Sequence, residues 1–330
     1  MSRLTSLPGI ELPIIQAPMA GVQDEALAVA VSTMGALGSM PCALLSSSRL
    51  KAALESFATM PQPINLNFFC HAMGDPDVAE GQRWRQALAP YYREFGVQPS
   101  PPSMADARRP LDAATVDLIE PFAPRIVSFH FGLPEAVLLD RMRDWGAVVL
   151  ASATTLDEAL WLQDRGVDFV IAQGIEAGGH RGMFLSADLT LQTTTAELVG
   201  SFCRELRVPV IAAGGITRRT DVEAMLALGA CAVQVGTAYL CCPEATTSAV
   251  HRAALREGGR DSAVTNLFSG RPARGLVNRL MREFGPISQL PPAFPWASRA
   301  LAPLRAAAEA RGLDDFTPLW SGSGNADHLG

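Results

Sequence analysis

The chain alternates short apolar runs with segments whose apolar residues recur at helical spacing. The eight apolar runs lie at residues 14–18, 35–39, 63–68, 125–129, 147–151, 168–172, 208–212 and 232–236. Short continuous runs of this kind indicate strands that are buried on both faces, as in a parallel sheet. Eight alternations of strand and helix predict an α/β protein with the (β/α)8 TIM-barrel fold. A doubly wound open sheet is the alternative.

Some segments between the runs carry clear signals for the start and end of a helix. Thr155 stands three residues before Glu158, which is the spacing of a capping box, and Gly166 follows where that helix would end. Residues 219–228 repeat this design and are followed by Gly229. Each of these segments therefore predicts a helix that leads through a glycine into the next buried strand.

Two regions exceed a minimal barrel. Residues 71–124 are a long, polar insertion after the third run, with a helical piece at 77–95. After the eighth run the chain is helical in parts, but the prolines of 290–296 exclude a regular helix there. We therefore expect a barrel unit of residues 1–240 that includes the insertion, and a helical or irregular C-terminal extension of residues 241–330 packed on the barrel.

Composition and charge narrow the range of partners. Of the 330 residues, 48% are hydrophobic and 18% are charged, and the formal net charge is -6. Nucleic acids and acidic membranes bind basic faces, so we expect neither partner. The N-terminus lacks a signal-peptide pattern, and no apolar stretch reaches the roughly 18 residues of a membrane helix, which predicts a cytoplasmic protein. The oligomeric state stays open between monomer and homodimer.

Glycines follow the seventh and eighth runs, at the barrel end where this fold carries its binding groups. The residues concerned are Gly214, Gly215, Gln234, Val235, Gly236 and Thr237. Because glycine lets backbone N–H groups approach an anion closely, we expect these two loops to bind a phosphate. The pattern does not distinguish FMN from a sugar phosphate.

The loop after the sixth run combines several glycines with one histidine. It reads QGIEAGGHRG from Gln173 onward and contains Gly178, Gly179 and His180. An imidazole with a pKa of about 6.5 exchanges protons near neutral pH, so we expect His180 to be catalytic. The glycines would let the backbone lie against a flat ring system. We expect Glu176 to orient the loop or to cap a helix.

Residues at the ends of the first and third runs could contact such a ring. Ala17, Pro18 and Met19 follow the first run. We expect Met19 and Ala20 to pack on a ring face, with their backbone N–H groups bonding its edge. Asn67 ends the third run and could bond a cofactor edge through its side-chain amide.

The other histidines differ in their expected roles. His130 ends the fourth run and is a second catalytic candidate, because it would face the same barrel end as His180. His71 lies in the insertion and is a weaker candidate. We expect His251 and His328 at the surface.

Several other chemistries lack sequence support. The chain has no G-x-S-x-G elbow, no Walker A sequence, no zinc motif and no G-x-G-x-x-G fingerprint. Its six cysteines include no C-x-x-C pair, so we expect free thiols packed as small apolar residues and no metal site.

Six segments together resemble the nitronate monooxygenase family, formerly called 2-nitropropane dioxygenases, and in particular its class I members. They are QAPMAG (16–21), SFHFG (128–132), IAQGIEAGGHRG (171–182), VPVIAAGGI (208–216), QVGTAYL (234–240) and PLWSG (318–322). The resemblance implies a non-covalent FMN within residues 1–240 and the oxidation of alkyl nitronates by O₂ to a carbonyl compound and nitrite. It implies that nitroalkanes are substrates too.

The resemblance also implies residue roles. The FMN phosphate would lie on Gly214, Gly215, Gly236 and Thr237. The ring and the ribityl chain would lie beside Met19, Asn67, Gln173 and Gly178. His180 would be the catalytic base.

Three other functions stay open at this stage. Related FMN barrels act as NAD(P)H-dependent reductases of quinones or enoyl thioesters. A phosphate-binding lyase or isomerase would use the same two loops without redox chemistry. A non-catalytic flavin-binding or interaction protein is the last alternative.

Overall fold

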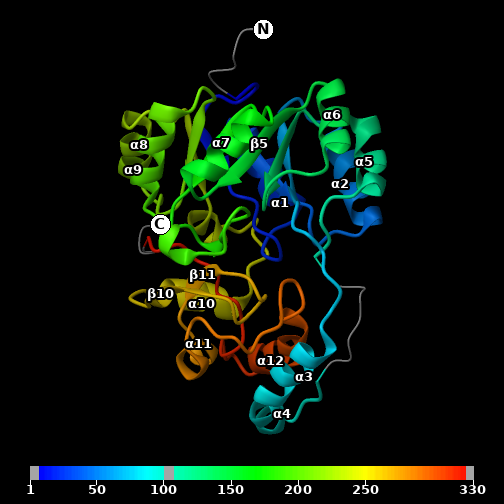
Figure 1. Ribbon diagram of the computed structural model, residues 1–330, viewed down its shortest axis with the longest axis vertical. Coiled ribbons are helices and arrows are strands. Elements are labelled where there is room, and N and C mark those ends of the chain that lie inside the picture. Colours follow the sequence, from blue (N-terminus) through cyan, green and yellow to red (C-terminus); the bar gives the residue numbers. More distant parts are fainter. Residues whose placement is uncertain (1–6, 100–107, 325–330) are drawn as a thin grey trace.

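Eight parallel strands form a barrel in the computed structural model, which describes residues 7–99 and 108–324 (Figure 1). The strands are β1 (Ile14–Gln16), β2 (Gly38–Pro41), β3 (Ile64–Phe69), β4 (Ile126–His130), β5 (Val148–Ala153), β6 (Phe169–Gln173), β8 (Val210–Ala213) and β9 (Ala232–Val235). They pair in the order β1-β9-β8-β6-β5-β4-β3-β2, and a parallel bridge between Ile15 and Leu37 joins the two ends of this order. The predicted TIM barrel is therefore confirmed, and the open sheet is excluded.

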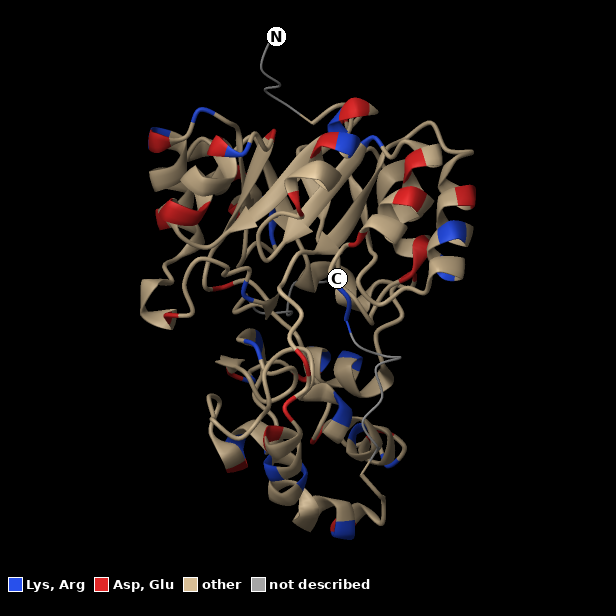
Figure 2. Ribbon diagram, turned by 45° about the vertical axis from the view of Figure 1, so that its right-hand side comes forward, with Lys and Arg blue, Asp and Glu red and all other residues tan. Residues whose placement is uncertain are grey.

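Helices surround the barrel and carry most of its charged side chains, of both signs (Figure 2). They are α1 (Glu25–Thr33), α2 (Ser47–Phe57), α5 (Ala113–Ile119), α6 (Ala136–Asp144), α7 (Leu156–Asp164), α8 (Thr195–Glu205) and α9 (Arg219–Ala227), with short 3-10 helices η1 (Glu120–Phe122) and η2 (Leu189–Leu191). Val127 and Val149 pack outward in a cluster with helix residues. Ile126 and Leu150 belong to a second cluster, drawn from strands around the barrel, that fills its interior. This separation follows from the two-residue period of a strand.

The insertion and the C-terminal extension pack together in a second lobe below the barrel (Figure 1). This lobe contains α3 (Val78–Ala87), α4 (Ala89–Phe95), α10 (Ala249–Glu257), α11 (Arg279–Phe284) and α12 (Ser298–Glu309). Trp84 of α3 is fully buried there, and its Nε1 donates a hydrogen bond to the Ala297 carbonyl oxygen at 3.2 Å. The Tyr92 hydroxyl of α4 donates to the Ala300 carbonyl oxygen at 2.7 Å. The predicted helical insertion and helical extension are thus both present, and they share one apolar cluster.

A small antiparallel sheet connects the extension to the barrel. It consists of β10 (Ser262–Thr265), β11 (Ala273–Leu276) and β7 (Gly179–His180), in the order β10-β11-β7. The register places His180 opposite Ala273. The extension is therefore not only helical or irregular, and the glycine-rich loop after β6 is held by strand pairing.

The helix signals are confirmed in part. The Thr155 side chain accepts from the Glu158 N–H, as expected at the start of α7. The reciprocal half of the capping box is absent, because Glu158 is buried and accepts instead from Thr154 and from the Phe184 N–H at 2.6 Å. A complete capping box forms at α8, between Thr194 and Glu197. Within the described ranges, no helix has the length and apolarity that crossing a membrane requires.

Candidate active site

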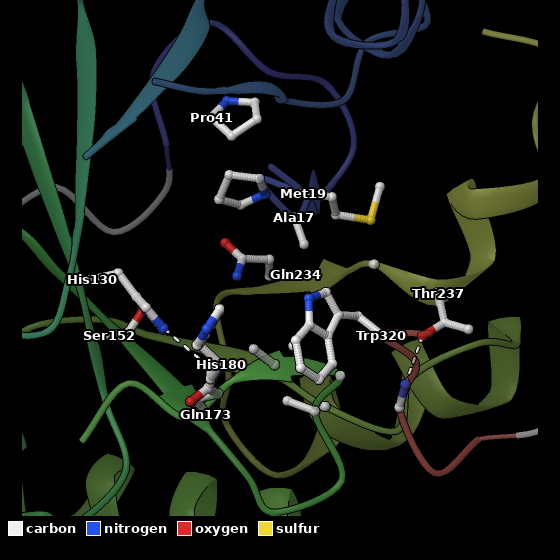
Figure 3. A pocket seen from close by; sticks show the side chains of 18 of the residues that line it. Ala17, Met19, Pro41, His130, Ser152, Gln173, His180, Gln234, Thr237 and Trp320 are labelled. Carbon is white, nitrogen blue, oxygen red and sulfur yellow. Dashed lines mark hydrogen bonds between the residues drawn. The ribbon is translucent and has the colours of Figure 1, made fainter. Parts of the chain in front are cut away.

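A cavity of about 1300 Å³, part of it open to solvent, lies at the carboxyl ends of the barrel strands. Fourteen of the fifteen expected site residues line it: Ala17, Pro18, Met19, Asn67, His130, Gln173, Gly178, Gly179, His180, Gly214, Gly215, Gln234, Gly236 and Thr237. Figure 3 shows several of these side chains converging on one space. The exception is Val235, whose buried side chain packs in the cluster between strands and helices.

The two loops after β8 and β9 expose backbone at the cavity. Gly214 and Gly215 have φ angles of +125° and +70°, which disfavour residues with a Cβ. A Cβ at Gly214 would come within 2.7 Å of the Thr195 hydroxyl oxygen and 2.9 Å of the Ala177 nitrogen. Glycine is therefore required at position 214 by both conformation and space.

The extension completes this end of the cavity. After β9, the 3-10 helix η3 (Thr237–Cys241) begins at Thr237, whose hydroxyl oxygen accepts from the Gly322 N–H at 2.9 Å (Figure 3). A Cβ on Gly178 would lie 2.6 Å from the Gly322 nitrogen, so the segment around Gly322 lies directly against the glycine-rich loop. The PLWSG motif thus contributes Trp320 and Gly322 to the cavity.

The end of β1 differs from the sequence expectation in one detail. Met19 lines the cavity, but its backbone N–H donates to the Gln23 side-chain oxygen at 2.8 Å. The Ala17 N–H donates to the Val235 carbonyl oxygen at 2.7 Å. The expected use of the Met19 amide toward a ring edge is therefore wrong, because that amide has a partner within the chain. The Met19 side chain is left for contact with a ligand.

Asn67 presents an acceptor to the cavity. Its Nδ2 donates to the Ser128 hydroxyl oxygen at 2.9 Å and to the Ser128 carbonyl oxygen at 3.3 Å. These bonds fix the orientation of the amide group. Within the described residues, the Asn67 Oδ1 has no hydrogen-bond donor and is not sealed in the protein interior, so it is an acceptor at the cavity.

Gln173 and Arg181 hold the loop that carries His180. Gln173 donates from Nε2 to the His180 carbonyl oxygen at 3.0 Å and accepts at Oε1 from the Gly182 N–H at 2.7 Å. Arg181 is only 1% exposed and donates to the carbonyl oxygens of Gly174 and Gln173, each at 2.7 Å. The loop is therefore fixed to the end of β6 at several points.

Glu176 confirms its expected role. Its Oε2 accepts from the Thr195 N–H at 2.9 Å and from the Thr195 hydroxyl at 3.0 Å. Thr195 is the first residue of α8, so Glu176 caps that helix and orients the loop.

The His180 imidazole lies in an aromatic enclosure. Its ring centroid is 5.5 Å from that of Phe294, 5.6 Å from Trp320, 6.1 Å from Phe131 and 6.3 Å from Phe69. Desolvation lowers the pKa of His180 well below its ordinary value, and the charge of Arg108 lowers it further. Burial therefore favours the neutral imidazole, which is the form that can accept a proton.

His130 lies beside His180 and contacts its backbone. The His130 Nε2 is 3.1 Å from the His180 carbonyl oxygen (Figure 3). Desolvation lowers the pKa of His130 to about 3, against the opposing effect of this hydrogen bond. The two catalytic candidates are thus together, but one ring nitrogen of His130 is engaged in positioning the other histidine.

The surface expectation for His251 is wrong. His251 lies in α10, is 2% exposed and lines the cavity. The apolar face of this amphipathic helix packs toward Leu240 and Leu319, which draws the histidine inward. His71 is also buried, against Phe294, and His328 lies outside the described residues.

Three residues at the site were not among those expected from the sequence. Trp320, Ser269 and Phe294 come from the extension, and each contacts the His180 ring or its Nε2. They are brought there by long-range packing and by the pairing of β11 with β7. Only Trp320 lay in a segment that the family resemblance included. Within residues 7–99 and 108–324, no group of three His, Cys, Asp or Glu side chains is arranged to hold a metal ion.

Comparison with known proteins assigns the chain to a family. The family model "Nitronate monooxygenase" matches residues 1–328. Nitronate monooxygenase from Paraburkholderia phytofirmans is 40% identical over 98% of this chain and 89% of its own length. Nitronate monooxygenase from Pseudomonas aeruginosa is 40% identical over 98% of this chain and 93% of its own.

A solved structure supports the same assignment. The nitroalkane oxidase from Streptomyces ansochromogenes superposes with a TM-score of 0.86 at 33% identity, over 97% of this chain and 94% of its own. Sequence and structure therefore agree over nearly the whole length. The chain belongs to the nitronate monooxygenase family.

Proposed function

We propose that the protein oxidises alkyl nitronates, with FMN as cofactor and O₂ as co-substrate, to a carbonyl compound and nitrite. The observation that carries the proposal is the His180 imidazole in an aromatic enclosure that favours its neutral form, at one side of a cavity whose other side includes glycine backbone. Family membership supports the same reaction.

The residues of the cavity fit FMN. Gly214 and Gly215 line the cavity, and glycine backbone can approach a phosphate closely. Met19 offers an apolar face for a ring, and Asn67 offers an amide oxygen. We propose that these residues hold the cofactor together with Gln173, Gly178, Gly236 and Thr237. FMN, when bound, would accept an electron from the nitronate.

His180 would serve neutral nitroalkanes by removing the α-proton. The C–H bond breaks, its electron pair stays on the substrate as the nitronate, and the proton moves to the imidazole. An already ionised nitronate needs no base. The aromatic side chains around the ring reduce its contact with water.

One series of measurements tests this function. The purified protein should show a flavin absorbance spectrum, and a nitronate should cause oxygen uptake with nitrite formation. A colourless protein that also binds no added FMN would overturn the cofactor proposal. Rapid bleaching by NADH or NADPH without oxygen, together with no nitronate turnover, would support a reductase instead. The cytoplasmic location and the monomeric or homodimeric state stay predictions.

A further inference from the structure

Ser269 has a single hydroxyl hydrogen and three hydrogen-bond neighbours. Its Oγ lies 2.9 Å from the His180 Nε2 and 3.2 Å from the Arg271 carbonyl oxygen, and the Arg271 N–H points to it at 3.4 Å. A carbonyl oxygen can only accept, whereas the imidazole Nε2 can accept or donate, so the arrangement that satisfies all three neighbours sends the hydroxyl hydrogen to Arg271. Among the described residues, no other donor reaches that carbonyl.

In that arrangement, the Ser269 oxygen has only lone pairs left for its other two neighbours. One lone pair accepts from the Arg271 N–H, and the other faces the His180 Nε2. A favourable contact at 2.9 Å therefore requires a hydrogen on the Nε2. A neutral imidazole carries one hydrogen, so the Nδ1 holds the free lone pair.

The position of Ser269 is fixed by its neighbour. Gly270 has a φ angle of +83°, and a Cβ there would lie 2.1 Å from the Pro292 carbonyl oxygen. The Gly270 N–H also donates to the Asn266 carbonyl oxygen at 2.9 Å. The loop between β10 and β11 is thus held against the segment that leads to Phe294, and Ser269 is 1% exposed.

The His180 Nδ1 faces the cavity. Within the part of the chain that the structure describes, it has no hydrogen-bond partner, and it is not among the ring nitrogens sealed from solvent, unlike both nitrogens of His71. His180 lines the cavity, while its Nε2 points to the extension. The two ring nitrogens therefore have separate surroundings.

We propose that Ser269 is a positioning residue that holds His180 in the Nε2–H tautomer, so that Nδ1 is the atom that accepts the α-proton of the substrate. The proposal rests on the base role given to His180 above. When Nδ1 takes the proton, the Nε2–H···Ser269 bond stays in place and no hydroxyl has to rotate. The other tautomer would need Ser269 to turn away from Arg271 before the ring could be protonated at Nε2.

Nitrogen NMR tests the tautomer without any turnover. The chain has five histidines, so protein labelled with 15N-histidine gives few signals, and those of His180 are assigned by their absence in His180→Asn. We expect long-range 1H–15N correlations of the Nε2–H pattern for His180 near pH 7.5. A dominant Nδ1–H pattern in the unaltered protein would overturn the proposal.

Ser269→Ala and Ser269→Thr separate the role of the hydroxyl from that of packing. Ser269→Ala should give both tautomers of His180 and reduce kcat on a neutral nitroalkane about tenfold, with nitronate turnover changed less than about twofold, as expected for one lost hydrogen bond. Ser269→Thr keeps the hydroxyl and should restore the Nε2–H pattern. An Nε2–H pattern that persists in Ser269→Ala would show that Ser269 does not set the tautomer. Absent nitronate turnover in the unaltered enzyme, with the Nε2–H pattern present, would overturn the proposed function alone.

Discussion

The Nε2 of His130 donates a hydrogen bond to the backbone carbonyl oxygen of His180, at 3.1 Å. The direction is fixed because a carbonyl can only accept. The Gln173 amide donates to the same oxygen at 3.0 Å. The two donors hold the catalytic candidate by its backbone, so we propose that His130 acts on the reaction through His180.

Replacing His130 with phenylalanine should reduce turnover without emptying the cofactor site. Phenylalanine keeps the ring contacts with Phe69 and Phe131 but removes one of the two hydrogen bonds to His180. We expect kcat on a nitroalkane to fall about tenfold, as for the loss of one buried hydrogen bond. Oxygen uptake measures this effect, and FMN titration is the control. An unchanged kcat would contradict the positioning role.

Replacing His180 with asparagine should affect the two forms of the substrate differently. Nitroalkane turnover requires a base, whose contribution is typically 10² to 10⁴-fold, so we expect a loss of at least about 100-fold. Nitronate turnover requires no proton removal and should fall less than about tenfold. Oxygen uptake with each form of one compound provides the comparison. Equal losses on both forms would argue against the base assignment.

Substituting Gly214 with alanine should weaken cofactor binding. The new methyl group would meet the Thr195 hydroxyl and the Ala177 nitrogen at under 3 Å, at a φ angle of +125°. The loop must shift, and we expect FMN affinity to fall at least about tenfold, which corresponds to about 1.4 kcal/mol. Titration of apoprotein followed by FMN fluorescence measures the change.

Gly74→Ala is the matched control for this experiment. Gly74 lies in the insertion, no atom lies within 4 Å of a Cβ built there, and its φ angle is not positive. The FMN affinity of the Gly74→Ala variant should equal that of the unaltered protein. Equal affinities for Gly214→Ala and Gly74→Ala would contradict the role given to the loop after β8.

The barrel itself could be predicted from the sequence. All eight apolar runs became strands, displaced by at most three residues, because burial on both faces leaves a continuous apolar signal. The strand ends then brought fourteen expected residues to one cavity, since parallel strands of a barrel end at the same face.

The contribution of the extension could not be predicted in this way. Ser269 and Phe294 contact His180 from 89 and 114 positions away along the chain, through the pairing of β11 with β7 and through packing of loops. Local periodicity contains no information on such contacts. His251 was misplaced for a related reason, because a single polar residue in a helix does not reveal which face the tertiary packing will bury.

Trp84 tests the contact between insertion and extension. Its side chain is fully buried and donates to the Ala297 carbonyl oxygen. We expect Trp84→Ala to reduce the free energy of unfolding by about 3–5 kcal/mol, the usual range for a large buried aromatic residue. Trp84→Phe should cost less, because it keeps most of the apolar contact. Urea denaturation measures both, and a loss below about 1 kcal/mol for alanine would contradict this packing.

Buried histidines should make the fold sensitive to acid. Desolvation lowers the pKa of His251 to about 4, that of His71 to about 4 and that of His130 to about 3. In the unfolded chain these rings titrate near 6.5, so between about 6.5 and 4 the unfolded state binds more protons than the folded state. The free energy of unfolding should therefore decrease as the pH falls through this window, and should be insensitive to these groups above it.

His251→Gln measures how much one histidine contributes to this loss of stability in acid. Glutamine does not titrate in this range, so the free energy of unfolding of the variant should fall less steeply on acidification. Between pH 6 and pH 4.5 we expect its slope to be smaller than that of the unaltered protein by about 1 kcal/mol per pH unit. Urea denaturation of both proteins at pH 7.5, 6 and 4.5 gives the two slopes, with pH 7.5 as the reference for any general effect of the substitution. Parallel slopes would show that His251 binds its proton over the same pH range in the folded and unfolded protein, so that its burial does not oppose the charge.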